Sequence, residues 1–189
     1  VVGYIGSMRK LEGLDIIIEA FPYMLQKLPN AKLLLVGCGD YIQNILEKAK
    51  QLKIESSVIY TGSVPQNDVA QYYSLIDIFF VTRSPNEKVN QIVTPLKPLE
   101  AMAMRKCLIV SDLPALKEFV TDNETGKILY NYNPFDLADL SVNLYKNKSM
   151  MQVIGRNAHA FVVNNFTWKN TISKYIPVYH SLATNKASK

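Results

Sequence analysis

The sequence is poor in cysteine and histidine and contains no long hydrophobic run. Its two cysteines, Cys38 and Cys107, and its two histidines are too far apart for a disulfide framework or a metal-binding motif. We therefore predict reduced, packed thiols and no bound metal. No stretch approaches the roughly eighteen uninterrupted apolar residues that indicate a membrane span, and no secretory signal is visible. These absences favour a cytoplasmic protein.

A large excess of one charge is also missing, because 21 basic and 16 acidic residues give a net charge of only +5. The basic residues are spread along the chain instead of forming one stripe, so binding to nucleic acid has weak support. The last third is locally basic, through Lys146, Lys148, Lys169, Lys174, Lys186 and Lys189. These lysines form either a solvated helix face or a peripheral contact with anionic lipid at the inner face of the membrane.

The residues that are present are typical of a globular fold, with 48% hydrophobic and 20% charged side chains in 189 residues. Short apolar runs of strand length alternate with amphipathic helical patterns. This alternation predicts a Rossmann-like, doubly wound α/β fold, with a parallel sheet of about six strands and helices on both faces. Terminal helices are predicted over about 148–185. The predicted strands are Val1–Ile5, Ala31–Val36, Ser57–Tyr60, Ile76–Val81, Cys107–Val110 and Gly126–Tyr130.

The segment from Thr94 to Glu100 connects two predicted strands and organises the chain. Pro95 and Pro98 cannot lie inside a helix but suit its first turn, so a helix is predicted to begin near one of them. Unpaired backbone N–H groups and the Lys97 cation then face any ligand in front of this turn, which suits a phosphate. Glu100 either stabilises the helix by roughly 0.3–1 kcal/mol or accepts hydrogen bonds from vicinal hydroxyls of a ligand.

Glycine-containing loops follow the first three predicted strands, where open α/β sheets place ligand contacts. The loop 6–13 has glycine at both ends and two cations, Arg9 and Lys10, which either meet a diphosphate or are solvated. The second loop, 37–40, contains G-x-G but lacks the third glycine of a dinucleotide-binding fingerprint, so a dehydrogenase has weak support.

The segment 94–104, TPLKPLEAMAM, closely resembles the donor-site signature of the retaining family 4, or group 1, glycosyltransferases. The resemblance extends over the whole chain, to the Phe-Thr-Trp run at 166–168 before the last helix. These are GT-B enzymes whose C-terminal half binds a nucleotide-diphosphate sugar. The resemblance implies one nucleotide-sugar-binding domain over 1–189, a fragment of a longer two-domain protein. The absence of an initiator methionine before the first strand favours the same conclusion.

The resemblance also implies roles for individual residues. Glu100 is expected to bind the ribose hydroxyls, and Lys97 and Arg9 to assist departure of the diphosphate by preorganised electrostatics, with no cofactor. The last helix of such enzymes crosses back onto the N-terminal domain, and Trp168 is expected to be a packing anchor at its start. The other expected nucleotide-binding residues are Gly6, Ser7, Lys10, Gly37, Gly39, Gly62, Val64, Thr94, Pro95 and Leu96.

Three positions depart from the family pattern. The family usually has a glutamate eight positions before the one matching Glu100, an arginine after the first glycine of loop 6–13 and a lysine before the second. This chain has Ile92, Ser7 and Glu12 at those positions. Because Ile92 replaces the glutamate that would contact the donor sugar, other side chains of the connection 82–91 are expected to make this contact. The candidates are Glu87, Asn90 and Gln91.

The function implied is transfer of a sugar, with retention, from a UDP-sugar or GDP-sugar to a saccharide or lipid-linked acceptor. Synthesis of bacterial surface polysaccharide or glycoconjugate is the expected setting. Acceptor-binding groups are expected from the missing N-terminal domain, so the fragment alone is predicted to be inactive. The alternatives are a nucleotide-sugar epimerase of the same fold and a nucleotide-binding module that has lost catalysis. The three departures from the family pattern favour the module.

Overall fold

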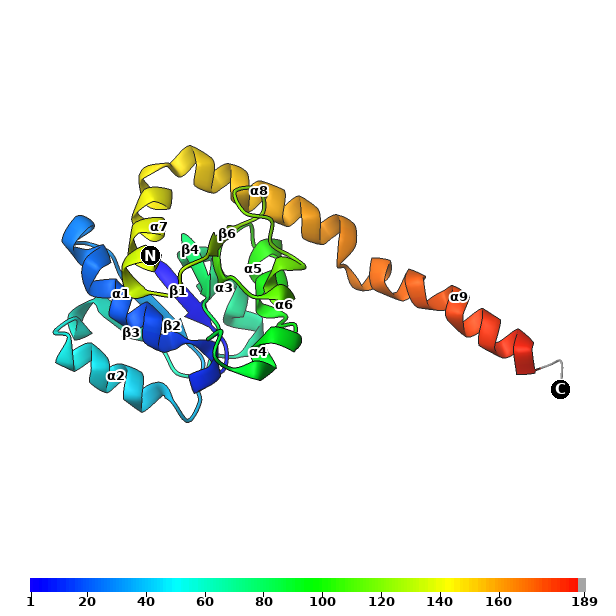
Figure 1. The fold of residues 1–189 in the computed structure, drawn as a ribbon, viewed down its shortest axis with the longest axis horizontal. Coiled ribbons are helices and arrows are strands. Elements are labelled where there is room, and N and C mark those ends of the chain that lie inside the picture. The colour runs from blue at the N-terminus through cyan, green and yellow to red at the C-terminus, as the bar shows by residue number, and fades with distance from the viewer. Residues whose placement is uncertain (187–189) are drawn as a thin grey trace.

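The computed structural model describes residues 1–186 and contains a six-stranded parallel sheet in the order β3-β2-β1-β4-β5-β6 (Figure 1). Each strand occupies one of the predicted apolar runs, so the Rossmann-like α/β prediction is confirmed. The strands are β1 (Val2–Ile5), β2 (Leu33–Val36), β3 (Val58–Tyr60), β4 (Ile78–Val81), β5 (Cys107–Ser111) and β6 (Lys127–Leu129).

The central strands are apolar throughout because both faces of the sheet are covered. In β4, Ile78 and Phe80 point into one buried cluster, whereas Phe79 and Val81 point into a second cluster on the other face. β1 pairs with β2 on one side and β4 on the other. Glycine at position 3 suits this crowded centre, where an added Cβ would lie 2.6 Å from Ile76.

Helices cover the two faces in two groups. The first cluster is shared with α1 (Leu14–Lys27), α2 (Ile42–Gln51) and α7 (Pro134–Lys146). The second is shared with α3 (Val69–Leu75), α5 (Lys97–Ala103), α6 (Pro114–Lys117) and part of α8 (Lys148–Asn165). Three single turns, η1 (Lys10–Glu12), η2 (Glu55–Ser57) and η3 (Gln66–Asp68), and the short helix α4 (Lys88–Ile92) lie in the connections.

Helix α5 begins at Lys97 and has Pro98 in its first turn, within the region predicted for its start. It ends at Ala103, and Arg105 then adopts a left-handed conformation with φ of 57° as the chain turns into β5. Seven residues give a short helix with few aligned peptide dipoles. The cations around the start of α5 therefore supply most of the positive charge there.

The terminal helices α8 and α9 (Trp168–Lys186) occupy the range predicted for them. Thr167 caps α9, since its hydroxyl accepts a hydrogen bond of 3.2 Å from the Asn170 amide. The expectation that Trp168 is a packing anchor is wrong for this chain, because α9 leaves the body of the molecule and the Trp168 side chain is 82% exposed (Figure 1). The side chains of Lys186 and Lys189, from the predicted basic face, lie outside the described residues. None of the helices within 1–186 is both long enough and apolar enough to cross a membrane.

Candidate functional site

A cleft of about 630 Å³ opens at the carboxyl ends of β1, β2 and β4. Its volume is within the roughly 300–1,000 Å³ that ligand pockets occupy. The strand order reverses beside β1, and open α/β sheets bind their ligands in the crevice at such a point. The lining residues are Ile5, Gly6, Ser7, Arg9, Glu12, Val36, Gly37, Ser63, Val64, Gln66, Val69, Arg83, Val93, Thr94, Pro95, Leu96, Lys97 and Glu100.

Ten of the thirteen residues predicted to bind the nucleotide or assist catalysis line this cleft. They come from four separate loops, which the parallel sheet brings to one edge. Their individual roles stay predictions. The ten are Gly6, Ser7, Arg9, Gly37, Val64, Thr94, Pro95, Leu96, Lys97 and Glu100.

The other three predicted residues, Lys10, Gly39 and Gly62, are not among the lining residues. Lys10 belongs to η1 and lines a separate hollow. Gly39 packs on the neighbouring loop, where an added Cβ would lie 2.2 Å from the Met8 carbonyl oxygen. The Gly62 carbonyl accepts a hydrogen bond of 2.8 Å from the Gly37 amide. These two glycines therefore shape the loops that form the wall.

Glu100, in the first turn of α5, lines the cleft and is held by a buried tyrosine that the sequence analysis missed. The Tyr73 hydroxyl of α3 donates a hydrogen bond of 3.0 Å to Glu100 Oε2. Burial, and then the charge of Glu100, raise the pKa of Tyr73, so this hydroxyl stays protonated and can donate. A carboxylate has acceptor sites on both oxygens, so the bond fixes the direction of the group and leaves capacity for a ligand.

A charged cluster forms the base of the cleft beside Glu100. Arg83, two residues after the end of β4, donates to both oxygens of Glu12, with Nε to Oε2 at 3.3 Å and Nη2 to Oε1 at 3.2 Å. Lys97 Nζ donates to Glu12 Oε1 at 3.1 Å. Arg83 Nη1 also donates to the Val93 carbonyl oxygen at 3.1 Å. The cluster therefore connects the loops after β1 and β4 to the start of α5.

The Lys97 side chain reaches Glu12 by crossing the backbone of Gly6. A Cβ at position 6 would lie 2.2 Å from Lys97 Cε, and Gly6 has a φ of 147°. The Lys97 ammonium also lies 5.6 Å from the centre of the Tyr4 ring, which is within cation–π distance. Glycine at position 6 is thus required for Lys97 to reach the cleft along this path.

The Glu12 carboxyl gives the stability of the chain a predictable pH dependence. Burial opposes its ionisation, but hydrogen bonds from Arg83 and the charge of Lys97 outweigh burial and hold its pKa below the ordinary 4.5. A lowered pKa in the folded state contributes stability above pH 4.5 that is lost as the pH falls through the folded value. In unfolding titrations between pH 3 and 7, the stability lost through Glu12→Gln should be constant down to about pH 5 and shrink below pH 4.5. A difference that grows on acidification would contradict this result.

The connection after β4 is more ordered than the sequence suggested, since it contains α4. Asn90 is fully buried, and its amide donates to the Leu11 carbonyl at 2.9 Å and the Ser84 carbonyl at 3.0 Å. The hypothesis that Asn90 contacts a donor sugar is therefore not supported by its position. Ile92 is 80% exposed, next to the cleft residues 93–96.

The cysteines differ in accessibility. Cys107 is buried in β5, and burial raises the pKa of its thiol to about 12. Cys38 is exposed in the loop after β2, directly after the cleft residue Gly37, so the prediction that both thiols are packed is wrong for Cys38. Within residues 1–186, no three or more His, Cys, Asp and Glu side chains lie together in a way that could hold a metal ion.

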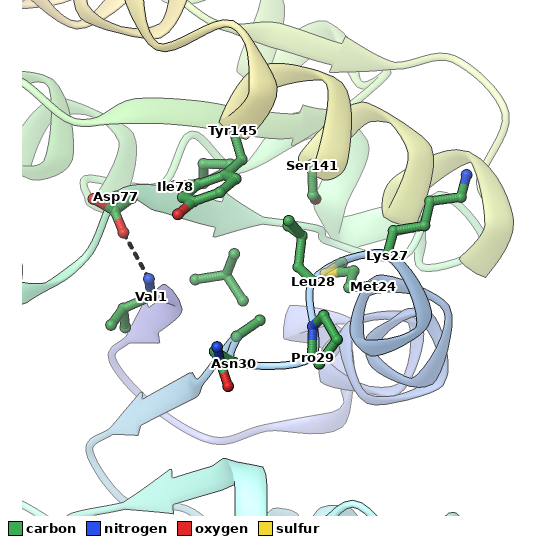
Figure 2. A pocket seen from close by; sticks show the side chains of 12 residues that line it. Val1, Met24, Lys27, Leu28, Pro29, Asn30, Asp77, Ile78, Ser141 and Tyr145 are labelled. Carbon is green, nitrogen blue, oxygen red and sulfur yellow. Dashed lines mark hydrogen bonds and ion pairs between the residues drawn. The ribbon is translucent and has the colours of Figure 1, made fainter.

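A second hollow, of about 270 Å³, lies at the opposite end of the sheet, between the end of α1 and α7 (Figure 2). Its lining includes apolar side chains such as Met24 and Leu28. The cleft is the better candidate site, because it brings cations, a carboxylate and loop backbone together at the carboxyl ends of the strands.

The sequence and the fold of this chain are both similar to those of known glycosyltransferases. The sequence profile of the family described as glycosyl transferases group 1 matches residues 1–161. N-acetyl-alpha-D-glucosaminyl L-malate synthase of Bacillus anthracis is 26% identical over 179 residues, covering 95% of this chain and 45% of that protein. The structure of Anabaena HepE in complex with UDP is 20% identical, with a TM-score of 0.81, over 97% of this chain and 48% of HepE. The C-terminal domain of LpcC, a group 1 family protein of Francisella tularensis, is 23% identical, with a TM-score of 0.77, over 88% of this chain and 86% of that domain.

The solved structures, at these identities, establish the fold, which is that of GT-B glycosyltransferases. This chain matches the C-terminal half of the larger proteins and spans about half the length of the relatives that it matches. The family profile covers most of the chain. The chain therefore belongs to the group 1 glycosyl transferase family.

Proposed function

We propose that this chain is the donor-binding half of a glycosyltransferase that uses a UDP-sugar or GDP-sugar. The observation that carries the proposal is the cleft itself, in which Glu100, Lys97 and Arg9 face one space beside the loops of β1 and β2. The UDP bound in the HepE structure is consistent with it. The acceptor is a saccharide or a lipid-linked saccharide, and transfer retains the anomeric configuration, in synthesis of a bacterial surface polysaccharide or glycoconjugate.

The proposed roles of the cleft residues are those implied by the family resemblance, and the geometry is consistent with them. Glu100, fixed by Tyr73, binds the ribose hydroxyls, and the backbone of 94–96 meets the diphosphate. Lys97 and Arg9 offset the negative charge that develops on the leaving diphosphate as the glycosidic bond breaks. Such fixed cations stabilise the transition state without reorganising, so the proposal requires no cofactor. Donor binding takes place in the cytoplasm, and peripheral contact of the basic terminal helices with anionic lipid stays a prediction.

The groups that bind the acceptor belong to the other half of the longer protein in this proposal. The isolated chain is then expected to bind nucleotide without transferring sugar. A nucleotide-binding module without catalysis is the second candidate, and the exposed Ile92, where the family usually has glutamate, favours it. Transfer or hydrolysis of a nucleotide sugar by the longer protein would favour the transferase. Inactivity with a broad panel of donors and acceptors would favour the module.

Removing the Glu100 carboxylate tests the nucleotide site directly. By calorimetric titration, Glu100→Ala should weaken UDP or GDP binding about tenfold or more, because hydrogen bonds to a charged group contribute roughly 1.5–3 kcal/mol. Inorganic pyrophosphate has no ribose, so its affinity should not fall. Glu47→Ala is the matched control, since Glu47 is an exposed helical carboxylate that does not line the cleft. Failure of the wild-type chain to bind UDP, GDP or ADP would count against the donor site.

A further inference from the structure

The cleft contains two carboxylates, Glu100 and Glu12, and only Glu12 is buried between the cations that face an anionic ligand. Its side chain is only 4% exposed, yet it lines the cleft beside Arg83 and Lys97. A carboxylate at this point repels the diphosphate that the proposed function assigns to the cleft. The proposed function therefore leaves the presence of Glu12 unexplained.

The charges of the cluster show what Glu12 does for its two neighbours. Two cations, Arg83 and Lys97, share one carboxylate, so the cluster has a net charge of +1 instead of +2. Both cations are largely buried, with side chains 9% and 16% exposed, and a buried charge without a partner is strongly unfavourable. Glu12 supplies that partner while no ligand is bound.

The two cations are also held in place by other groups. Arg83 donates to the Val93 carbonyl, and the Lys97 chain passes over Gly6 and near the Tyr4 ring. They therefore remain close to the cleft whether their anion is Glu12 or a bound diphosphate. The carboxylate and the ligand are alternative partners for the same N–H groups.

We propose that Glu12 is an internal counter-ion that competes with the diphosphate for Arg83 and Lys97 and so favours release of the nucleoside diphosphate product. The inference rests on the proposed function of the cleft. Cleavage of the donor leaves a nucleoside diphosphate with one more ionised oxygen than the nucleotide sugar. The repulsion from Glu12 is therefore greater for the product than for the donor. Glu12 is a positioning residue in this scheme, because it acts through the two cations.

A series of charge variants tests the proposal by calorimetric titration with UDP. Glu12→Gln raises the net charge of the cluster to +2 and should tighten UDP binding about tenfold or more. Arg83→Gln lowers it to zero and should weaken binding about tenfold or more. The double variant Glu12→Gln/Arg83→Gln returns to +1, so its affinity should lie within about threefold of the wild type. Uridine, which has no phosphate, should bind all four proteins equally.

A purely structural role for Glu12 gives a different pattern. Both single variants would then weaken UDP and uridine alike, and that result would overturn the proposal, as would unchanged UDP binding by Glu12→Gln. Glu12→Asp is the matched control, because it keeps the charge and should keep UDP affinity near that of the wild type.

Two further comparisons keep the result decisive. If Glu12→Gln does not fold, the step from Arg83→Gln to the double variant removes the same carboxylate and should tighten UDP binding by the same factor. Inorganic pyrophosphate should follow the same charge series as UDP. A chain that binds no UDP but whose pyrophosphate affinity follows the series would contradict the proposed function and still support the role of Glu12.

Discussion

Replacing Gly13 with alanine is expected to destabilise the chain by about 3–5 kcal/mol, a large part of the roughly 5–15 kcal/mol that stabilises a typical domain. Gly13 has a φ of 70°, and an added Cβ would lie 1.7 Å from the Thr82 carbonyl oxygen. That oxygen is itself fixed, since it accepts a hydrogen bond of 2.9 Å from the Tyr132 hydroxyl. Thr82 Oγ1 donates to the Gly13 carbonyl at 3.1 Å. The loop after β1 therefore cannot move away without breaking its contact with the end of β4.

Gly62→Ala is the matched control for this prediction. Gly62 has nearly the same φ, 72°, but nothing lies within 4 Å of an added Cβ. Its replacement should cost only the left-handed backbone strain of roughly 1–2 kcal/mol. Urea denaturation of both variants measures the two losses. Equal losses would show that the close approach to Thr82 can be relieved, and that only the backbone conformation matters.

The central strands were predictable from the sequence because a strand that is buried on both faces is a continuous apolar run. β4 is an example, with Ile-Phe-Phe-Val at 78–81 and polar residues on both sides. The position of the cleft follows from the same pattern, since parallel strands bring their carboxyl ends to one edge. The loops that line the cleft could therefore be predicted from the sequence, although the directions of their side chains could not.

The cluster at the base of the cleft could not be predicted in the same way. Arg83 was counted as part of a polar connection, yet it is 7% exposed and pairs with Glu12, which lies 71 positions earlier in the chain. The spacing of two residues in the sequence does not show whether their side chains, on different loops, lie within hydrogen-bonding distance. The available signal was an arginine two residues after a buried strand, at the edge where the ligand was expected. Lys10 shows the opposite error, because its neighbour Arg9 reaches the cleft and Lys10 does not.

Lys97→Met should lower kcat for sugar transfer by the longer protein about 10²–10³-fold, in addition to a roughly tenfold loss of donor affinity from the missing positive charge. Glu12, which is itself held by Arg83, holds Lys97 at the start of α5, where the charge of the departing diphosphate grows during the reaction. Methionine keeps the length and apolar contacts of the side chain over Gly6 but removes the cation. The loss should therefore fall mainly on kcat, measured with the nucleotide sugar whose diphosphate binds best.

Lys10→Met is the control that distinguishes a positioned cation from a general effect of charge. Both substitutions remove one positive charge from the segments around the cleft, but only Lys97 lines it. If the net charge of this face were what mattered, both variants would lose activity to a similar extent and the loss would fade with added salt. If the position of Lys97 matters, Lys10→Met should keep a rate near that of the wild type. A Lys97→Met enzyme with an undiminished kcat would instead leave Arg9 as the cation that assists departure of the diphosphate.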